Sequence, residues 1–273
     1  MARVRQAVMA LAMGAALAGC GTQTAPQATP VVVDSGSPTP STPAGSATVS
    51  SSSSSASSSS TRSTSPSSSP TTTAADTSLR PGDDGARVRQ LQRDLSALGY
   101  WLGTPDGTYG HLTSQAVMAL QKSAGLSRDG IAGPRTLEAL AAGTLPPLPA
   151  GPADRIDIDL TRQVLIVVRG GSIEHVINTS TASGETYLSH GRPAVAVTPK
   201  GTFTVGRVHR GNEVAPLGTL YSPRYFYGGY AVHGSGSIPG YPASHGCARV
   251  SNRAMDMIWS TDLMPVGSTV VVR

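Results

Sequence analysis

A cysteine lies among histidine, glycine and arginine residues in one short segment, SHGCAR, at residues 244–249. Cys247 is one of two cysteines in the chain, and a second histidine, His233, lies upstream beside Gly234. A thiol becomes a strong nucleophile when it loses its proton, and a histidine either accepts that proton or stays charged beside the thiolate. The segment therefore predicts covalent catalysis by Cys247 with His233 as its partner, and the Gly234 carbonyl can orient the imidazole ring.

The neighbours of Cys247 suit the other needs of a site that attacks a carbonyl carbon. Gly246 permits a sharp turn, so the backbone N–H groups of His245, Gly246 and Cys247 can point at one developing oxyanion. Arg249 supplies a permanent positive charge, which favours a thiolate or holds a substrate carboxylate. These residues together predict acyl transfer through the thiol.

Two other interpretations of the same residues stay open at this point. A lone cysteine is most often a small buried hydrophobic residue, although the polar surroundings of Cys247 disfavour that role. His233, His245 and Cys247 are also plausible zinc ligands. A fourth ligand is not evident in the sequence, and a single residue between His245 and Cys247 is awkward spacing for one metal ion.

The elements that must position these residues are mostly strands. Alternating or apolar runs predict five of them, at Arg155–Leu160, Val164–Val168, Lys200–Val205, Tyr230–His233 and Thr269–Val272. The first alternates polar and apolar residues, as a half-buried strand does, and the second is its expected hairpin partner. One helix is expected from about 252 to 259, with Ser251 as its N-cap. Residues 154–273 are thus predicted to form a mostly β domain with one helix after Cys247.

The segment 79–142 has the spacing of a small all-α module. Its first part carries four apolar residues in steps of 3, 4 and 3, which place them on one helical face. They are Val88, Leu91, Leu95 and Leu98. The motif Asp-Gly-x-x-Gly-x-x-Thr occurs at 106–113 and again, 23 residues later, at 129–136. Each copy predicts a tight glycine turn before a helix, so three short helices are expected around one core.

The whole of 79–142 resembles the peptidoglycan-binding domain of bacterial wall enzymes. The shared pattern is LQ...LGY...DG.YG..T..AV..LQ...GL..DGI.GP.T...L, which is specific as a set although each piece is weak alone. The resemblance implies binding to wall glycan or stem peptides. A helical spacer in which Tyr100, Trp101 and Tyr109 only pack is the alternative. The proline-rich segment 143–153 is expected to hold the two domains apart as a semi-rigid linker, so that a fragment 150–273 folds alone.

Residues 154–273 resemble the L,D-transpeptidase catalytic domain along their whole length. Four strings carry the resemblance: IDIDL at 156–160, TPKGTF at 198–203, VHG at 232–234 and SHGCARV at 244–250. The last two are highly specific as a pair. The resemblance implies that Cys247 is the nucleophile and His233 the general base.

The same resemblance implies roles for the residues around this pair. The Gly234 carbonyl would orient the imidazole, the amides of 245–247 would bind the oxyanion, and His245 and Arg249 would support the site electrostatically. Ser244 and Arg249 are the expected substrate-binding residues, and neither a metal ion nor an organic cofactor is expected. Some members carry serine in place of Gly234 and asparagine in place of Arg249, which leaves the roles of these two residues open.

The implied activity is peptidoglycan cross-linking. Cys247 would attack the carbonyl of the L-centre of diaminopimelate in a tetrapeptide stem and release D-alanine. An amine of a second stem would then resolve the thioester and form a 3→3 cross-link. Carbapenem-type inhibitors are expected to acylate the same thiol. Hydrolysis by an L,D-carboxypeptidase and a non-catalytic wall-binding lipoprotein are the alternatives.

The first residues predict export. Arg3 and Arg5 precede an apolar run of 11 residues, Ala7–Leu17, which is shorter than the roughly 20 residues that span a bilayer and is typical of a signal peptide. The ending LAGC resembles a bacterial lipobox. It implies that residues 1–19 are removed and that lipidated Cys20 anchors an extracytoplasmic protein to the membrane. An ordinary secretory signal with a free Cys20 is the alternative.

Residues 20–78 are predicted to be a disordered tether. From 21 to 78 the chain has no aromatic residue and only three charged ones, so it buries too little apolar area to offset its ordering entropy. Its reach is roughly 40 Å. The formal net charge of +5 falls to +3 without the two arginines of the leader (+5 − 2). Because no basic cluster interleaves with aromatic residues, nucleic acid is not an expected partner.

Overall fold

The computed structural model describes residues 77–189 and 191–273. The predicted signal peptide (1–19), the lipidation site Cys20 and the tether as far as residue 76 lie outside the described residues, so these remain predictions. In the described part, no helix has both the length and the apolar character that crossing a bilayer requires.

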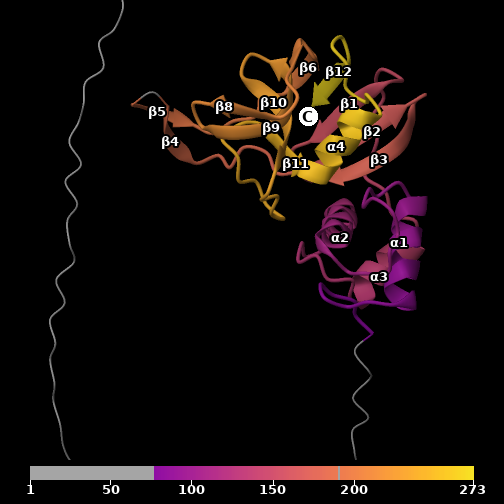
Figure 1. Ribbon diagram of the computed structural model, residues 1–273. Coiled ribbons are helices and arrows are strands. Elements are labelled where there is room, and N and C mark those ends of the chain that lie inside the picture. The colour runs from indigo at the N-terminus through magenta and orange to yellow at the C-terminus, as the bar shows by residue number, and fades with distance from the viewer. Residues whose placement is uncertain (1–76, 190) are drawn as a thin grey trace, which may run out of the picture. The chain divides into compact units, whose positions relative to one another are not determined.

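The N-terminal module consists of three helices, as the spacing predicted (Figure 1). They are α1 (Ala86–Ala97), α2 (His111–Ser123) and α3 (Pro134–Ala141). Val88, Leu91 and Leu95 lie on one face of α1 and are buried in a core to which α2 also contributes. Pro134 occupies the first turn of α3, where its missing N–H leaves no helical hydrogen bond unmade.

The repeated Asp-Gly motif builds two equivalent turns. In each copy a buried glutamine accepts a hydrogen bond from the amide of the motif's first glycine and donates to the side chains of its aspartate and threonine. The first set is Gln92 with Gly107, Asp106 and Thr113, and the second is Gln121 with Gly130, Asp129 and Thr136. The motif's aspartate and threonine side chains therefore hydrogen-bond within the module and fix its turns.

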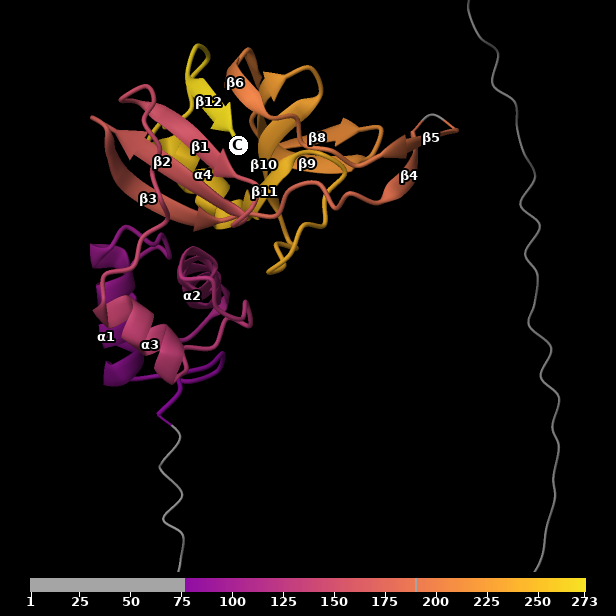
Figure 2. The ribbon, with the colours of Figure 1, turned by 180° about the vertical axis from the view of Figure 1, so that it is seen from behind.

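The first sheet of the C-terminal domain has the strand order β3-β2-β1-β12-β6 (Figure 2). Its strands are β1 (Arg155–Asp159), β2 (Val164–Arg169), β3 (Ser172–Asn178), β6 (Gly201–Thr204) and β12 (Thr269–Val272). The predicted hairpin of β1 with β2 is present, and β12 pairs in parallel with β1. The four strands predicted here from the sequence are confirmed, while β3 had no prediction.

The second sheet carries the residues predicted to react. Its order is β11-β10-β9-β7, with β8 also paired to β9. The strands are β7 (Arg207–Val208), β8 (Asn212–Ala215), β9 (Gly218–Tyr227), β10 (Tyr230–Ser235) and β11 (Ala248–Ser251). A separate hairpin joins β4 (Thr186–Ser189) to β5 (Arg192–Val195). Helix α4 (Asn252–Ser260) follows β11 directly, and Ser251 accepts a hydrogen bond from Ala254 N as its predicted N-cap.

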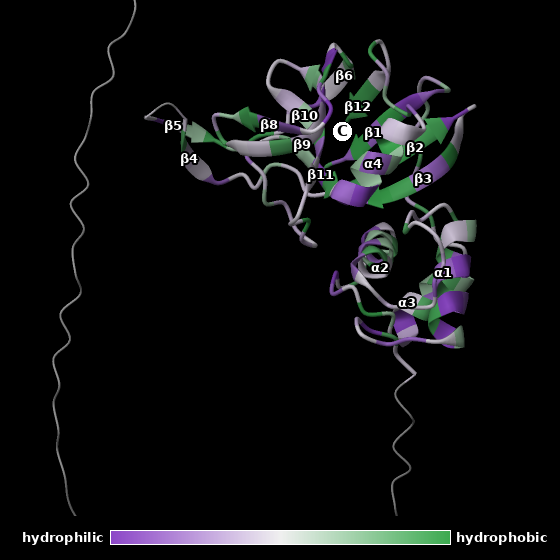
Figure 3. Cartoon of the chain, in the orientation of Figure 1, coloured by the Kyte–Doolittle hydropathy of each residue, from purple (hydrophilic) through white to green (hydrophobic). Residues whose placement is uncertain are grey.

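Strand β2 is buried on both faces. Leu165 and Val167 pack in the core between the two sheets, whereas Val164, Ile166 and Val168 belong to the core of the helical module. Hydrophobic residues accordingly run along β2 without interruption (Figure 3). Such a continuous apolar run is typical of a strand covered on both sides, and here the second cover is the helical module.

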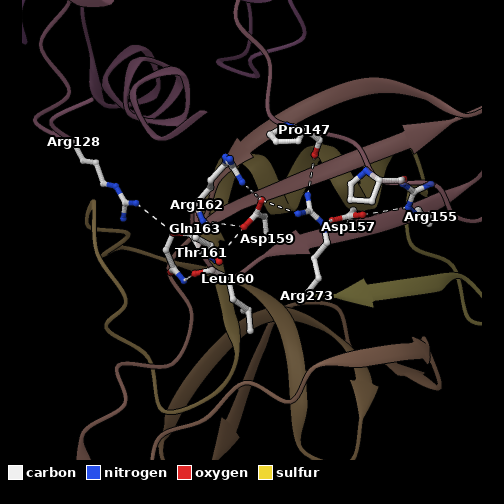
Figure 4. A network of polar contacts seen from close by, with 11 residues as sticks. Arg128, Pro147, Arg155, Asp157, Asp159, Leu160, Thr161, Arg162, Gln163 and Arg273 are labelled. Carbon is white, nitrogen blue, oxygen red and sulfur yellow. Dashed lines mark hydrogen bonds and ion pairs between the residues drawn. The ribbon is translucent and has the colours of Figure 1, made fainter. Parts of the chain in front are cut away.

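The proline-rich segment does not hold the modules apart, contrary to the expectation from its composition. The described residues all fall within a single compact unit, because the helices and the first sheet share one core. Arg155 of β1 and Arg273, directly after β12, also bind the segment. Arg155 donates to the carbonyls of Pro149 and Pro152. Arg273 donates to the carbonyl of Pro147 (Figure 4).

The alternation in β1 has a different cause from the half-exposure that it predicted, because all five of its residues are buried. Its polar positions form an ion-pair network beneath the proline-rich segment (Figure 4). Asp157 pairs with Arg155 and Arg273, and Asp159 pairs with Arg273 and Arg162. The polar face of β1 is thus buried through pairing rather than exposed to water.

Candidate active site

A cleft of about 370 Å³ opens beside the end of β10 and the start of β11. These strands pair in parallel, which places His233 opposite Arg249 and Val232 opposite Ala248. Cys247 directly precedes this ladder. The site residues named from the sequence that line the cleft are His233, Ser244, His245, Gly246, Cys247 and Arg249. Two motifs separated in the sequence therefore meet at one cleft because their strands are neighbours.

The imidazole of His233 is held in one tautomer. Its Nδ1 lies 2.9 Å from the carbonyl oxygen of Gly234, and because a carbonyl only accepts, Nδ1 carries the hydrogen. The other ring nitrogen, Nε2, is then the basic one. Burial lowers the pKa of His233; the Gly234 hydrogen bond opposes this and the charge of Arg249 adds to it. The resting imidazole is therefore neutral and able to accept a proton.

The thiol of Cys247 is also neutral at rest. Burial raises its pKa, and this outweighs the opposing effects of the Ala231 amide and the Arg249 charge. The sulfur lies 3.8 Å from the carbonyl oxygen of Gly229, which suits a protonated thiol as a weak donor. Of the two states that the sequence left open, the neutral thiol with a neutral base is the one that both pKa shifts favour.

The loop before Cys247 is folded by hydrogen bonds of Ser244. The Ser244 hydroxyl donates to the carbonyl of Cys247 over 2.6 Å and accepts from the amide of Gly246 over 3.1 Å. Ser244 is buried and lines the cleft, and both of these hydrogen bonds hold the loop, so its contact with a substrate stays a prediction. The Gly246 amide is likewise occupied. Of the three amides expected to bind the oxyanion, those of His245 and Cys247 have no hydrogen-bond partner among the described residues.

Gly246 is required by a close approach to an aromatic ring. A Cβ at this position would lie 2.6 Å from a ring carbon of Tyr230, far inside contact distance. The carbonyl of Gly246 accepts a 2.7 Å hydrogen bond from the buried hydroxyl of Thr198. Thr198 belongs to the TPKGTF string, and its place beside Gly246 is a supporting role that the sequence did not reveal.

Two side chains offer charge or stacking to a substrate. Arg249 is fixed through its backbone, which exchanges two hydrogen bonds with Ser180, and it is one of the residues that line the cleft. Across residues 77–189 and 191–273, no ion pair neutralises it. His245 stacks at a tilt on Tyr187, with 4.6 Å between ring centroids. Tyr187 lies on the β4–β5 hairpin and also lines the cleft; no motif pointed to it.

Gly234 occupies a position where this chain leaves no room for a side chain. A Cβ there would lie 2.6 Å from a ring carbon of Tyr221 and 2.7 Å from Asn252 Oδ1. Tyr221 is held in place by a 2.6 Å hydrogen bond to Asp256 of α4. The serine that some family members carry at this position is therefore incompatible with the packing here.

Metal binding receives no support from the geometry. In the part of the chain that the structure describes, no three residues among histidine, cysteine, aspartate and glutamate cluster closely enough to hold a metal ion. His233, His245 and Cys247 thus share a cleft without forming a ligand set.

A second hollow, of about 620 Å³, lies between the helical module and α4. The module contributes Trp101, Asp106 and His111, and α4 contributes Arg253 and Asp256. A Gln92 hydrogen bond lowers the pKa of Asp106, which keeps that carboxylate charged. The hollow combines an aromatic ring, apolar side chains and charges of both signs.

Comparison with known proteins gives matches to both modules. Residues 84–140 match the family described as a peptidoglycan binding domain, and residues 153–272 match the family described as an L,D-transpeptidase catalytic domain. The crystal structure of the L,D-transpeptidase from Xylanimonas cellulosilytica is similar at 46% identity with a TM-score of 0.69. That alignment covers 71% of this chain and 97% of the other.

Two curated relatives each match over about a quarter of the chain. The N-acetylmuramoyl-L-alanine amidase CwlL of Bacillus licheniformis is 50% identical over 68 residues, which are 24% of this chain. A probable N-acetylmuramoyl-L-alanine amidase of the same organism is 47% identical over 66 residues, or 23% of this chain. The matched part spans 19% of the length of each of these amidases.

Proposed function

Because the chain belongs to the L,D-transpeptidase family, we propose that it forms 3→3 cross-links in peptidoglycan with Cys247 as its nucleophile. The observation that carries this proposal is the shared cleft of Cys247 and His233, with the imidazole held in the tautomer that leaves Nε2 basic. Thioester chemistry needs such a thiol and base side by side.

In the first half-reaction the donor stem acylates the enzyme. His233 Nε2 removes the thiol proton as Cys247 Sγ attacks the carbonyl carbon of the L-centre of diaminopimelate. The developing oxyanion accepts hydrogen bonds from the amides of His245 and Cys247. When the C–N bond breaks, the imidazolium returns its proton to the leaving amine, and D-alanine departs. The free guanidinium of Arg249 binds a carboxylate of the stem.

In the second half-reaction an acceptor resolves the thioester. The side-chain amine of another stem attacks the acyl carbon, and His233 takes a proton from that amine. Collapse of the intermediate breaks the C–S bond, and the proton returns to Cys247. Water in place of the amine gives an L,D-carboxypeptidase, which is the alternative with the same first step. An idle thiol in a wall-binding lipoprotein is the alternative without catalysis.

The decisive experiment incubates the protein with purified tetrapeptide muropeptides and identifies the products by mass spectrometry. Cross-linked dimers are expected from the wild type, and tripeptides alone would favour the carboxypeptidase. A carbapenem, whose strained amide imitates the scissile bond, should add its mass once, on Cys247. Cys247→Ala should give neither product nor adduct, and His233→Ala should slow acylation by roughly 10²–10⁴-fold. Unchanged turnover in Cys247→Ala would refute the mechanism, and inhibition by chelators would restore the metal hypothesis.

We also propose that 84–140 holds the protein on the wall and that the second hollow takes part. Its aromatic and charged lining suits a polymer with sugar rings, carboxylates and amines. The double variant His111→Ala/Arg253→Ala should sediment less with insoluble peptidoglycan than the wild type. Arg135→Ala, at an exposed position of α3, should sediment as the wild type does. Equal sedimentation of all three proteins would remove the hollow from the binding surface.

Membrane anchoring through Cys20 completes the proposal. The lipobox-like ending supports it, and extracytoplasmic localisation follows from the leader. Cys20→Ser should abolish labelling by a palmitate analogue in cells. A labelled Cys20→Ser protein would refute the anchor.

A further inference from the structure

The loop that carries the predicted nucleophile is held in its first part by the helical module. This loop runs from residue 236, after β10, to Cys247. Its buried residue Ile238 accepts hydrogen bonds at the carbonyl from Gln115 of α2, over 3.4 Å, and from Asn178 of β3, over 3.2 Å. Asn178 also donates to the Gln115 side chain over 2.6 Å. One residue of α2 thus contacts the loop directly and through Asn178.

A second contact lies two residues further along the loop. Arg128, in the turn after α2, donates a 3.1 Å hydrogen bond to the carbonyl of Gly240. The approach is so close that a Cβ on Gly240 would lie 2.7 Å from the carbonyl oxygen of Arg128 and 2.8 Å from its Cβ. Gly240 is therefore a contact point where the backbone of the helical module touches the catalytic loop.

The later part of the loop is supported from the catalytic domain, but this support also contacts α2. The amides of Ala243 and Ser244 donate to the carbonyl of Thr181. Thr179 precedes Thr181 in the same segment, and its hydroxyl donates to the carbonyl of Arg249 over 2.8 Å. Lys122 of α2 donates to the carbonyl of that same Thr179 over 2.8 Å. Both parts of the loop consequently have supports that end on the helical module.

We propose that the helical module is a structural part of the active site, with Gln115 and Arg128 as positioning residues for the loop of Cys247. The inference rests on the proposed acyl transfer at this thiol. Gln115 and Arg128 contact neither the thiol nor the cleft, and they act through the carbonyls of Ile238 and Gly240. They fix where the loop starts, and hence where the amides of His245 and Cys247 point.

Oxyanion binding is the function most sensitive to such positioning. Amides stabilise an oxyanion only at about 2.7–3.1 Å, and a misplacement of about 1 Å can slow a reaction roughly 100-fold. Alkylation of the thiol by iodoacetamide develops no oxyanion. Loss of the module's contacts should therefore slow acylation much more than alkylation.

The test compares these two rates in the full chain carrying Cys20→Ser, so that Cys247 is its sole cysteine. The variants Gln115→Ala and Arg128→Ala are measured with imipenem and with iodoacetamide. We expect the ratio of acylation to alkylation rates to fall about 10-fold in each and about 100-fold in the double variant. Arg128→Lys, which keeps a cationic donor, should recover most of the ratio. Arg135→Ala is the matched control and should equal the parent.

A second pair of variants tests the same contact from the loop side. Gly240→Ala forces the loop away from Arg128, whereas Gly236→Ala, in the same loop, places its Cβ in open space. The ratio should fall in Gly240→Ala and stay unchanged in Gly236→Ala. Thermal unfolding identifies any variant that is not folded, and the glycine pair keeps the comparison possible if Arg128→Ala is lost.

The outcomes separate this inference from the proposed function. If imipenem fails to acylate the parent protein, acyl transfer at Cys247 is wrong and the inference falls with it. If the parent is acylated and the folded variants keep its ratio, the proposed function stands and the positioning role is refuted. An equal fall in both rates would also refute it, because general loss of thiol access or structure would then explain the effect.

Discussion

Lys122 Nζ, on α2, donates a 2.8 Å hydrogen bond to the carbonyl oxygen of Thr179, at the end of β3. A second bond reaches the carbonyl of Gln163 over 3.0 Å. The lysine side chain is buried and faces two carbonyls instead of a carboxylate. Burial is the main reason that its pKa falls to about 7, and the nearby Arg128 adds to the effect. One titratable amine thus lies in the contact between the two modules.

This amine predicts a pH-dependent stability. Between pH 7 and about 10.5 the unfolded chain keeps the Lys122 proton and the folded protein does not, so the free energy of unfolding rises with pH in that window. From pH 6.5 to 9 the wild type should gain about 2 kcal/mol relative to Lys122→Met. Lys200→Met, at the chain's other and exposed lysine, should parallel the wild type. Urea unfolding at several pH values measures this, and parallel curves for wild type and Lys122→Met would contradict it.

The shared core predicts that the catalytic domain is not stable alone. A fragment 150–273 exposes Val164, Ile166, Val168 and Val176, whose burial is worth about 6–12 kcal/mol in total. The fragment should aggregate, or unfold at a lower temperature than 77–273, whereas 77–273 should be monomeric and unfold in one cooperative transition. Size-exclusion chromatography and thermal unfolding make the comparison. A monomeric 150–273 that unfolds at the temperature of 77–273 would show the domains to be separable after all.

The neutral thiol and imidazole predict a particular pH profile of acylation. His233 becomes protonated only below its lowered pKa, so the imipenem acylation rate should stay flat from pH 8 down to 6.5 and fall only below that. Because the pKa of Cys247 is raised, the ultraviolet absorbance of a thiolate should be absent at pH 7. The difference spectrum between wild type and Cys247→Ala reports it. A thiolate signal at neutral pH would indicate a resting ion pair instead.

Close packing at Gly234 predicts that a methyl group there is costly. Gly234→Ala drives Tyr221 and Asn252 apart, which should destabilise the protein by about 1–3 kcal/mol. It should also slow acylation, because the Gly234 carbonyl orients His233. Gly236→Ala, two residues later in open space, is the matched control. Unfolding and acylation in Gly234→Ala that match the control would disprove the packing argument.

What the sequence predicted depended on how local each signal was. His233 and Cys247 are recognisable because each lies in a short motif with its own glycine, and α1, α3 and α4 follow from local periodicity, a proline and a serine cap. Thr198 and Tyr187 were missed as members of the site because tertiary contacts of their side chains, not sequence proximity, bring them to the loop. The TPKGTF string indicated the family but no role for the Thr198 hydroxyl, and no motif surrounds Tyr187.

The mistakes arose where one signal had two physical explanations. The alternation in β1 looked like exposure to water, but Asp157 and Asp159 are buried by pairing with arginines, one of them Arg273 at the far end of the chain. The run Val164–Val168 was correctly predicted as a strand. Its lack of polar positions was itself a sign of burial on both faces, and that sign contradicted the interpretation of 143–153 as a spacer.

The interior place of β12 has a consequence for the order in which the protein folds. This strand comes after all the others in the chain, yet it lies between β1 and β6, with Val270 opposite Ile156. Until residues 269–272 have been synthesised, two inner strand edges remain unpaired, and such edges invite association with other chains. Pairing so distant in sequence also slows folding. We therefore expect the catalytic domain to fold late and as a whole, after residues 269–272 have emerged, rather than strand by strand.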